Sequence, residues 1–264
     1  MDISFIILTW NSFDHIKKCL ESLNASMKKS TLKYEIFIID NGSVDDTPSF
    51  LEQQNQLLPH VIKPIYLEEN KGTTYSRNLA IKEAEGNTIV VLDSDVEVFE
   101  GTLEKLTELL SSDNNIGLVA PKLVYGSGTL QKSTDNFPTF WNKALRYFFL
   151  KTIEKREHLT SSDDEVRSVD YAISAFWVIR RDVINKVGML DENIFYAPED
   201  VDYCLRIWKA GYKVVYIPHV TAIHHAQEIS RGLRINKALL RHIQGLIYYF
   251  RKHGYLFRRP KFNY

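Results

Sequence analysis

The stretch Thr88-Ile-Val-Val-Leu-Asp-Ser-Asp-Val-Glu-Val98 joins an uninterrupted apolar run to two aspartates that are separated by one serine. The run from Ile89 to Leu92 is typical of a strand that is buried on both faces, as in a parallel sheet. Asp93 and Asp95 follow at the C-terminal end of this strand, where open α/β sheets bind their ligands. Such a carboxylate pair can hold a divalent cation together with phosphate oxygens, although Asp and Ser are also ordinary turn residues.

Strands and helices alternate along the first part of the chain. Polar residues follow the first two predicted strands: Thr9 and Asn11 after one, Asp40 and Asn41 after the other. This alternation, which spans about 100 residues, predicts a mostly parallel sheet with helices on both of its faces. The predicted strands are 3–8, 35–39, 62–67 and 89–92, with helices from 12 to 23, from about 47, and from 74 to 85.

The rest of the chain is less regular. An irregular segment at 126–168, which can hold a helix at 140–153, indicates a functional or mobile loop. The residues before and after it predict helices at 101–110, 181–186 and 199–210, strands at 116–120 and 169–180, and two short strands on either side of Pro218.

Composition and charge limit the class of protein. With 264 residues, 44% of them hydrophobic and 25% charged, the chain has the composition of a soluble globular protein with a substantial core. From Ile229 onward there are nine Lys or Arg and no Asp or Glu, which predicts a basic extension facing an anionic partner. Cys19 and Cys204 lack metal-site spacing and are expected to be buried, reduced thiols of a cytoplasmic protein. We expect no signal peptide and no membrane span.

Three acidic residues, Glu199, Asp200 and Asp202, fall in the first turn of the predicted helix at 199–210. Acidic residues in this position stabilise a helix through its dipole, and Asp202 can pair with Arg206 four residues later. The functional alternative is that one of these carboxylates serves as a general base in a cleft.

Two adjacent histidines, His224 and His225, follow the last predicted strand. Neighbouring residues of a strand point to opposite faces, so at most one of the two enters a given site. A histidine at a strand end is usually structural. We would assign one of the two as a metal ligand only if the fold brings it close to Asp95.

In their order and spacing these motifs resemble those of the family 2 glycosyltransferases, and most of all the rhamnosyltransferase-type bacterial members that build polysaccharides. The resemblance covers roughly residues 1–228. In this family a glycine-bearing loop usually follows the histidine, but here the sequence is His225-Ala-Gln-Glu-Ile-Ser230, without the glycine. His225 therefore remains an alternative to His224 as the metal ligand. The motifs are Thr9-Trp-Asn11, Asp40-Asn-Gly-Ser43, Asn70-Lys-Gly72 with Arg77-Asn78, Asp93-Ser-Asp95, Arg180-Arg181 with Val187-Gly188 and Asp191-Glu192, Glu199-Asp-Val-Asp202 with Arg206, and His224.

The resemblance implies the GT-A fold, which is a single Rossmann-like α/β domain with a central, mostly parallel sheet flanked by helices. This domain would occupy residues 1–228, with a nucleotide-binding half at 1–100 and an acceptor and catalytic half at 101–228. A basic, aromatic-rich helical extension would follow at 229–264.

The resemblance also implies a role for individual residues. Mg²⁺ or Mn²⁺ would be held by Asp95 and His224, and Asp200 would be the catalytic base. The acceptor side would be formed or supported by Glu199, Asp202 and Trp177. The donor nucleotide would be bound by Thr9, Asn11, Asp40, Asn41, Arg77, Asp93 and Ser94.

The implied activity is transfer of a hexose-type sugar, with inversion, from a nucleotide-diphosphate donor to a carbohydrate or lipid-linked saccharide. The basic extension predicts either peripheral contact with the anionic inner face of the cell membrane or a helix packed on the domain with a solvated face.

No motif indicates nucleic-acid binding. The alternatives are an inactive nucleotide-sugar-binding protein and a nucleotidylyltransferase, although the glycine-rich basic loop of the latter is missing at Thr9–Asp14. The donor, the acceptor and the oligomeric state stay open.

Overall fold

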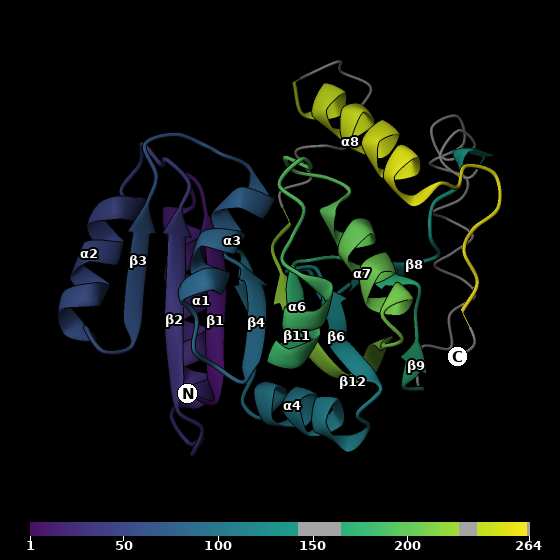
Figure 1. Cartoon of the computed structure of the whole chain (residues 1–264). Helices are drawn as coiled ribbons and strands as arrows, with labels where there is room; N and C mark the ends of the chain where they lie inside the picture. The colour runs from purple at the N-terminus through teal and green to yellow at the C-terminus, as the bar shows by residue number, and fades with distance from the viewer. Residues whose placement is uncertain (142–164, 227–236, 263–264) are drawn as a thin grey trace.

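The computed structural model describes residues 1–141, 165–226 and 237–262. Its centre is a mixed sheet with the strand order β3-β2-β1-β4-β11-β6-β12-β5, and helices cover both faces (Figure 1). The predicted helix at 140–153 lies almost entirely outside the described residues, as does the beginning of the C-terminal extension.

The N-terminal half has the predicted alternation. Its four strands pair in parallel, and each helix connects one strand to the next. The strands are β1 (Ile3–Thr9), β2 (Tyr34–Asp40), β3 (Ile62–Tyr66) and β4 (Thr88–Asp93), and the helices are α1 (Phe13–Met27), α2 (Thr47–Leu57) and α3 (Thr73–Glu83).

The second half completes the sheet in mixed orientation. β11 lies between β4 and β6 and is antiparallel to both, whereas β12 is parallel to β6. The strands are β5 (Val96–Glu97), β6 (Ile116–Val124), β7 (Leu130–Gln131), β8 (Thr134–Asp135), β9 (Arg167–Ser168), β10 (Tyr171–Ala172), β11 (Phe176–Arg180) and β12 (Lys213–His224), and the helices are α4 (Thr102–Ser112), α6 (Arg181–Val187), α7 (Glu199–Lys209) and α8 (Lys237–His253).

The core explains why β4 is an unbroken apolar run. Val90 and Leu92 belong to the hydrophobic cluster on one face of the sheet, and Ile89 and Val91 belong to the cluster on the other face. Both clusters are closed by helices, so each residue of the run is buried, as parallel strands require.

Two predictions of strands were wrong. The single strand predicted at 169–180 is divided into β10 and β11 by the turn at 173–175, where Ile173 N–H donates to Ser133 O. The two strands predicted around Pro218 form one strand, β12, whose pairing with β6 shifts register between Ile217 and Thr221. This irregularity accommodates a proline, because proline has no N–H to donate to the ladder.

Cys19 and Cys204 are buried free thiols, as predicted. Among the residues that the structure describes, no helix combines the length and the hydrophobicity that crossing a bilayer requires. At the C-terminal side, α8 packs across the loop that precedes α7, with Gly245 against the carbonyl oxygen of Ala197 (Figure 1).

Candidate active site

The polar residues that follow the parallel strands meet at one edge of the sheet. In the register of the sheet, Thr9 pairs with Asp40 and Leu8 pairs with Asp93. The C-terminal ends of β1, β2 and β4 are therefore adjacent, which is where open α/β sheets bind their ligands.

Asp93, Asp95 and His224 form a cluster of potential metal ligands at this edge. One ligand atom from each lies within 4.8 Å of the other two, and His224 Nε2 is 3.2 Å from Asp95 Oδ1. β12 brings His224 to this position by pairing with β5, directly after Asp95. Burial alone would raise the pKa of Asp95, but the hydrogen bond and charge of His224 outweigh it and hold this pKa below its usual value.

The surroundings of His224 fit a metal ligand. Its Nδ1 lies 2.8 Å from the side-chain oxygen of Gln131, which can only accept a hydrogen bond. Nδ1 therefore donates to Gln131, and Nε2, which contacts Asp95, can coordinate a cation after giving up its own proton. His225 points elsewhere, with its Nε2 2.6 Å from Glu97 Oε1. Of the two histidines, His224 is the one that lies with Asp93 and Asp95 in the part of the chain that the structure describes.

Arg77 connects the metal cluster to the first turn of α7. Its side chain is only 1% exposed, and its guanidinium contacts Asp93 Oδ1 at 2.5 Å and Glu199 Oε1 at 3.8 Å. Ser174 Oγ accepts a hydrogen bond from Arg77 at 2.9 Å and donates one to Glu199 Oε1, also at 2.9 Å. Arg77 thus lies beneath the site, where it orients both acidic groups.

Glu199 and Asp200 begin α7, and their side chains have different surroundings. Burial, followed by the charge of Asp200, raises the pKa of Glu199 to about 8. Glu199 is therefore protonated near neutral pH. Asp200 is only half-buried, and its Oδ1 accepts a hydrogen bond from Val201 N–H at 2.8 Å. Of the two, Asp200 is the carboxylate that solvent can reach.

The predicted donor-binding residues of β1 and β2 have two kinds of environment. Thr9 Oγ1 is buried and has no hydrogen-bond partner among the described residues, so it is available to a ligand. Asp40 is also buried, and burial raises its pKa in spite of the Ser43 hydrogen bonds. Asn11 Oδ1 accepts from Val44 N–H at 2.8 Å, and Asn41 Oδ1 accepts from Lys71 N–H at 2.9 Å. These two asparagines hold the surrounding loops in place.

A loop at 191–198, which precedes α7, contacts the start of α3. Phe195 O accepts a hydrogen bond from Thr73 N–H at 2.8 Å, and Ile194 O accepts one from Thr74 Oγ1 at 2.7 Å. Gly72, with φ +88°, leaves no room for a side chain, because a Cβ there would lie 2.2 Å from Phe195 O. The start of α3 therefore fixes this loop.

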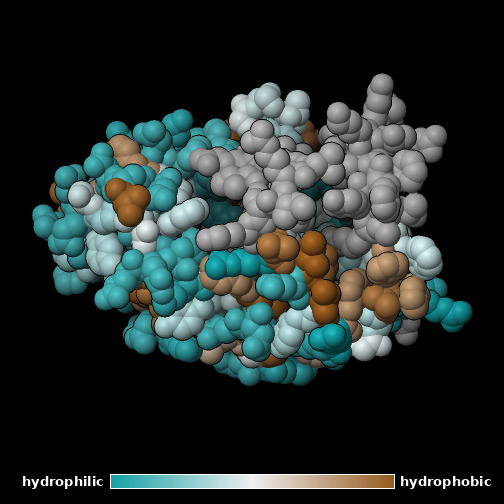
Figure 2. All heavy atoms as spheres, turned by 90° about the horizontal axis from the view of Figure 1, so that it is seen from above, coloured by the Kyte–Doolittle hydropathy of each residue, from teal (hydrophilic) through white to brown (hydrophobic). Residues whose placement is uncertain are grey.

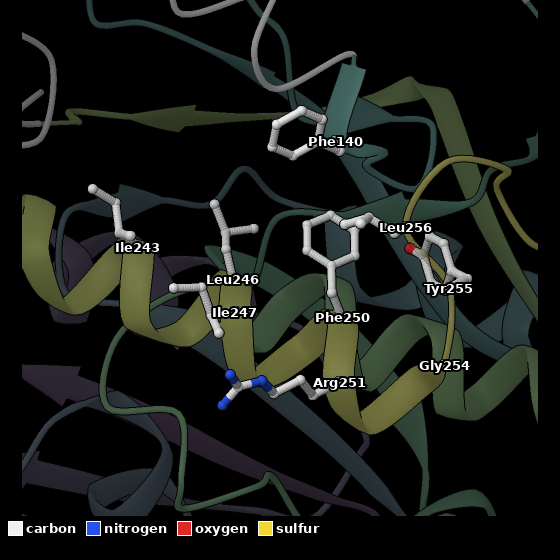
Figure 3. A pocket seen from close by; sticks show the side chains of 9 residues that line it. All are labelled: Phe140, Ile243, Leu246, Ile247, Phe250, Arg251, Gly254, Tyr255 and Leu256. Carbon is white, nitrogen blue, oxygen red and sulfur yellow. The ribbon is translucent and has the colours of Figure 1, made fainter.

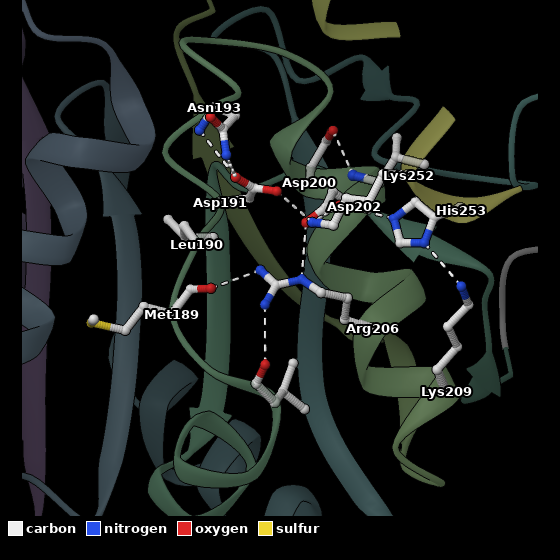
Figure 4. A network of polar contacts seen from close by, with 12 residues as sticks. Met189, Leu190, Asp191, Asn193, Asp200, Asp202, Arg206, Lys209, Lys252 and His253 are labelled. Atoms are coloured by element: carbon white, nitrogen blue, oxygen red, sulfur yellow. Dashed lines mark hydrogen bonds and ion pairs between the residues drawn. The ribbon is translucent and has the colours of Figure 1, made fainter. Parts of the chain in front are cut away.

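Asp202 lies in a different environment from Asp200. It is buried, with Arg206 Nε 2.9 Å from its Oδ2 and Lys252 Nζ and His253 Nε2 at 2.6 and 2.8 Å from its Oδ1 (Figure 4). Burial would raise the pKa of Asp202, but the hydrogen bonds from His253 and Lys252 and the charges of Arg206 and Lys252 lower it. Lys252 also contacts Asp191 Oδ2 at 2.6 Å. Asp202 therefore fastens α8 to α7.

Trp177 and Ser94 complete the predicted set. Trp177 is fully buried in β11, where its ring stacks on Tyr203 and its Nε1 donates to Ala172 O. Its place is behind the site and not at the surface of the site. Ser94 is 7% exposed, in the turn between Asp93 and Asp95.

Sequence reasoning missed several residues that shape the site. Gln131 has no neighbours in the chain that would mark it, because it contacts a histidine 93 positions away. Ser174 stands at a position where small residues are expected, but its role between Arg77 and Glu199 depends on partners far away in the chain. Lys252 and His253 were read only as part of a basic segment. Their pairing with Asp202 depends on how α8 packs, which local sequence patterns do not reveal.

Comparisons with known proteins agree with this geometry. Residues 4–188 match the family model described as glycosyl transferase family 2. A rhamnosyltransferase of Escherichia coli, WbbL, is 24% identical, over 97% of this chain and 96% of its own length. The N-acetylglucosaminyl-diphospho-decaprenol L-rhamnosyltransferase of Mycobacterium tuberculosis is 26% identical, over 83% of this chain and 75% of its own length.

A solved structure shows the same fold. The mannosyltransferase PcManGT from Pyrobaculum calidifontis, in complex with GDP-Man and Mn²⁺, superposes with a TM-score of 0.67 at 18% identity. The match covers 98% of this chain, and this chain spans 65% of that one. The predicted GT-A fold is confirmed.

Proposed function

The chain belongs to glycosyl transferase family 2, and from this premise we propose that it transfers a sugar, with inversion, from a nucleotide-diphosphate donor to a saccharide hydroxyl. One observation carries the proposal. Asp93, Asp95 and His224 offer three ligand atoms within 4.8 Å of one another, and Arg77 connects this cluster to the turn that carries Asp200.

Asp93, Asp95 and His224 are the residues that would hold Mg²⁺ or Mn²⁺. When bound, the cation would neutralise charge on the leaving diphosphate as a Lewis acid. Carboxylate oxygens are the ligands that such cations prefer. The structure of the mannosyltransferase from Pyrobaculum calidifontis, which contains Mn²⁺ and GDP-Man, supports a divalent cation as the cofactor of this chain.

The side chains of the protein would bind the nucleotide, position the acidic groups and accept the proton. Arg77 holds Asp93 and Glu199 in fixed positions, and Thr9 and Asp40 line the strand ends where the nucleotide would bind. Burial raises the pKa of Glu199 to about 8, which makes it a poor base near pH 7 and favours the more accessible Asp200 for this role. Asp200 takes the proton of the acceptor hydroxyl during attack. A single displacement with a single base gives inversion.

A lipid-linked saccharide is the proposed acceptor. The support is the printed activity of the Mycobacterium tuberculosis relative, whose substrate is linked to diphospho-decaprenol. The basic segment from 229 onward favours an anionic membrane as its partner. We therefore place the protein in the cytoplasm, at the inner face of the cell membrane.

The direct test is hydrolysis of nucleotide sugars by the purified protein. UDP-, dTDP- and GDP-sugars would be supplied with Mn²⁺, Mg²⁺ or EDTA, and release of nucleoside diphosphate would be measured. We expect slow, metal-dependent hydrolysis of one donor class. Formation of a nucleotide sugar from a nucleoside triphosphate and a sugar phosphate would instead identify a nucleotidylyltransferase. Failure of every nucleotide to bind, with metal present, would contradict the proposed site.

A further inference from the structure

Helix α8 has two faces with opposite surroundings. Its inner face packs on the catalytic half, where Tyr249 is fully buried and Gly245 lies against Ala197 O. Its outer face carries Leu240, Ile243 and Ile247, which are 51%, 45% and 48% exposed. Their spacing of three and four residues places these side chains in one stripe. Because α8 is already fastened by its inner face, the outer stripe is not needed to hold it in place.

The stripe continues into an apolar groove formed with other parts of the chain. The groove has a volume of about 610 Å³, and Phe140, Phe250 and Leu256 line it together with Ile243 and Ile247 (Figure 3). Phe140 N–H donates to Leu256 O at 2.8 Å, so these two distant segments lie together. In the view of Figure 2, hydrophobic residues gather in a band at the position of α8.

Exposed aromatic side chains extend this surface. Phe140, Trp141 and Phe257 are 48%, 59% and 58% exposed, and their ring centroids lie 5.7 to 6.2 Å apart. A cluster of exposed aromatic rings, tryptophan among them, is typical of contact with the headgroup region of a bilayer. We call Leu240, Ile243, Ile247, Phe140, Trp141, Leu256 and Phe257 the outer surface.

The segment that carries most of the outer surface is basic in sequence. The chain from Ile229 to its end contains nine Lys or Arg and no Asp or Glu. Arg251 lines the groove itself, and Arg258 follows Phe257 directly; both are exposed. A hydrophobic stripe with basic flanks complements a surface that offers hydrocarbon and phosphate together.

We propose that the outer surface binds an anionic phospholipid bilayer, with the apolar side chains inserted at the interface and the arginines on the headgroups. The inference deepens the proposed membrane location and rests on that part of the proposed function. It does not depend on the proposed sugar-transfer reaction. If the protein hydrolyses its donor but does not bind vesicles, only this inference is refuted and the proposed reaction is not.

Vesicle binding by the purified full chain tests the proposal. Vesicles of phosphatidylcholine alone would be compared with vesicles that contain phosphatidylglycerol in equal part, by co-sedimentation at low and high salt. We expect at least about tenfold tighter binding to the anionic vesicles, weakened by salt. Equal affinity for both kinds of vesicle, or no binding to either, would overturn the proposal.

Substitutions identify the surface involved. Ile243→Gln combined with Ile247→Gln should weaken binding to the anionic vesicles by about tenfold or more. Leu57→Gln is the matched control, since Leu57 is 71% exposed on α2 and lies outside the outer surface. Equal loss of binding in both variants would refute the assignment of the surface, as would burial of the stripe in a dimer of this chain.

A fluorescence measurement gives a second, independent result. If Trp141 enters the interface, tryptophan emission should shift to the blue when anionic vesicles are added, and Trp141→Phe should abolish the shift. A shift that persists in this variant would contradict insertion at Trp141.

Discussion

The guanidinium of Arg77 lies 2.5 Å from Asp93 Oδ1, within a side chain that is only 1% exposed. The same guanidinium is 3.8 Å from Glu199. One buried cation therefore fixes the distance between the metal cluster and the helix that carries Asp200. The two functions that we propose for the site, holding a cation and accepting a proton, would therefore depend on the same side chain.

Arg77→Lys should impair stability and donor binding together. Lysine cannot make the several directed hydrogen bonds of the guanidinium, so Asp93 and Ser174 would lose contacts inside the protein. We expect a loss of about 3 kcal/mol or more in the free energy of unfolding, measured by urea denaturation, and weaker metal-dependent donor binding. Arg180→Lys is the control, because Arg180 forms an exposed pair with Asp182, and such pairs contribute about 1 kcal/mol or less. Equal effects in the two variants would contradict a special role for Arg77.

The two adjacent histidines should differ in their effect on metal binding. His224→Ala should weaken Mn²⁺-dependent donor binding by about tenfold to a hundredfold, since it removes one ligand of the proposed set. Asp95→Ala should abolish that metal dependence. His225→Ala is the matched control, because His225 faces Glu97, and it should leave metal dependence unchanged. Calorimetric titration with the donor, with and without Mn²⁺, measures the donor affinity and its dependence on the metal. A larger loss of metal-dependent donor binding in His225→Ala than in His224→Ala would show that His225 is the ligand.

Gly245→Ala should reduce turnover although alanine favours a helix. In an ordinary helix interior the change would stabilise by about 1 kcal/mol. Here the new Cβ would lie 2.1 Å from Ala197 O and 3.1 Å from Pro198 Cδ, so the loop before Asp200 must move. Displacement of a catalytic group can cost up to about a hundredfold in rate. We expect a lower kcat for donor hydrolysis with donor affinity retained, whereas Gln244→Ala, at an exposed neighbouring position, should have no effect. An unaltered kcat in Gly245→Ala would refute this.

Glu199 should make the stability of the protein depend on pH. Its folded-state pKa is raised, from 4.5 to about 8, by burial and by the charge of Asp200. The neutral carboxyl of Glu199 therefore stabilises the folded state fully at pH values below the pKa of the unfolded state. This stabilisation is lost as the pH rises through the pKa of the folded state. Relative to Glu199→Gln, the wild-type free energy of unfolding should fall between pH 4.5 and 8, by at most about 1.4 kcal/mol per pH unit. Parallel pH profiles of the two proteins would contradict the shift.

The sequence predicted best those parts that local patterns determine. The run from Ile89 to Leu92 indicates a strand buried on both faces, and the motif that follows it necessarily lies at the edge of the sheet. The order of short motifs was specific enough to identify the family and to single out Asp95, Asp200 and His224. That these three residues belong to one site is an implication of the resemblance, because no local pattern relates His224 to Asp95.

Contacts between distant segments could not be predicted. The turn at 173–175 and the shifted register at Pro218 depend on pairing with β6 and on contacts with Ser133. The roles of Lys252 and His253 depend on the docking of α8 against Asp202. Neither periodicity nor composition contains this information, since both describe a segment by itself.

The most direct test of the central claim is donor hydrolysis by Asp200→Asn, in which water serves as the acceptor and no saccharide needs to be known. With the base removed, kcat should fall by about a hundredfold or more, while metal-dependent binding of the donor stays close to that of the wild type. Asp182→Asn, at an exposed carboxylate, should behave as the wild type in both measurements. Turnover retained by Asp200→Asn, with the donor bound normally, would show that Asp200 is not the base.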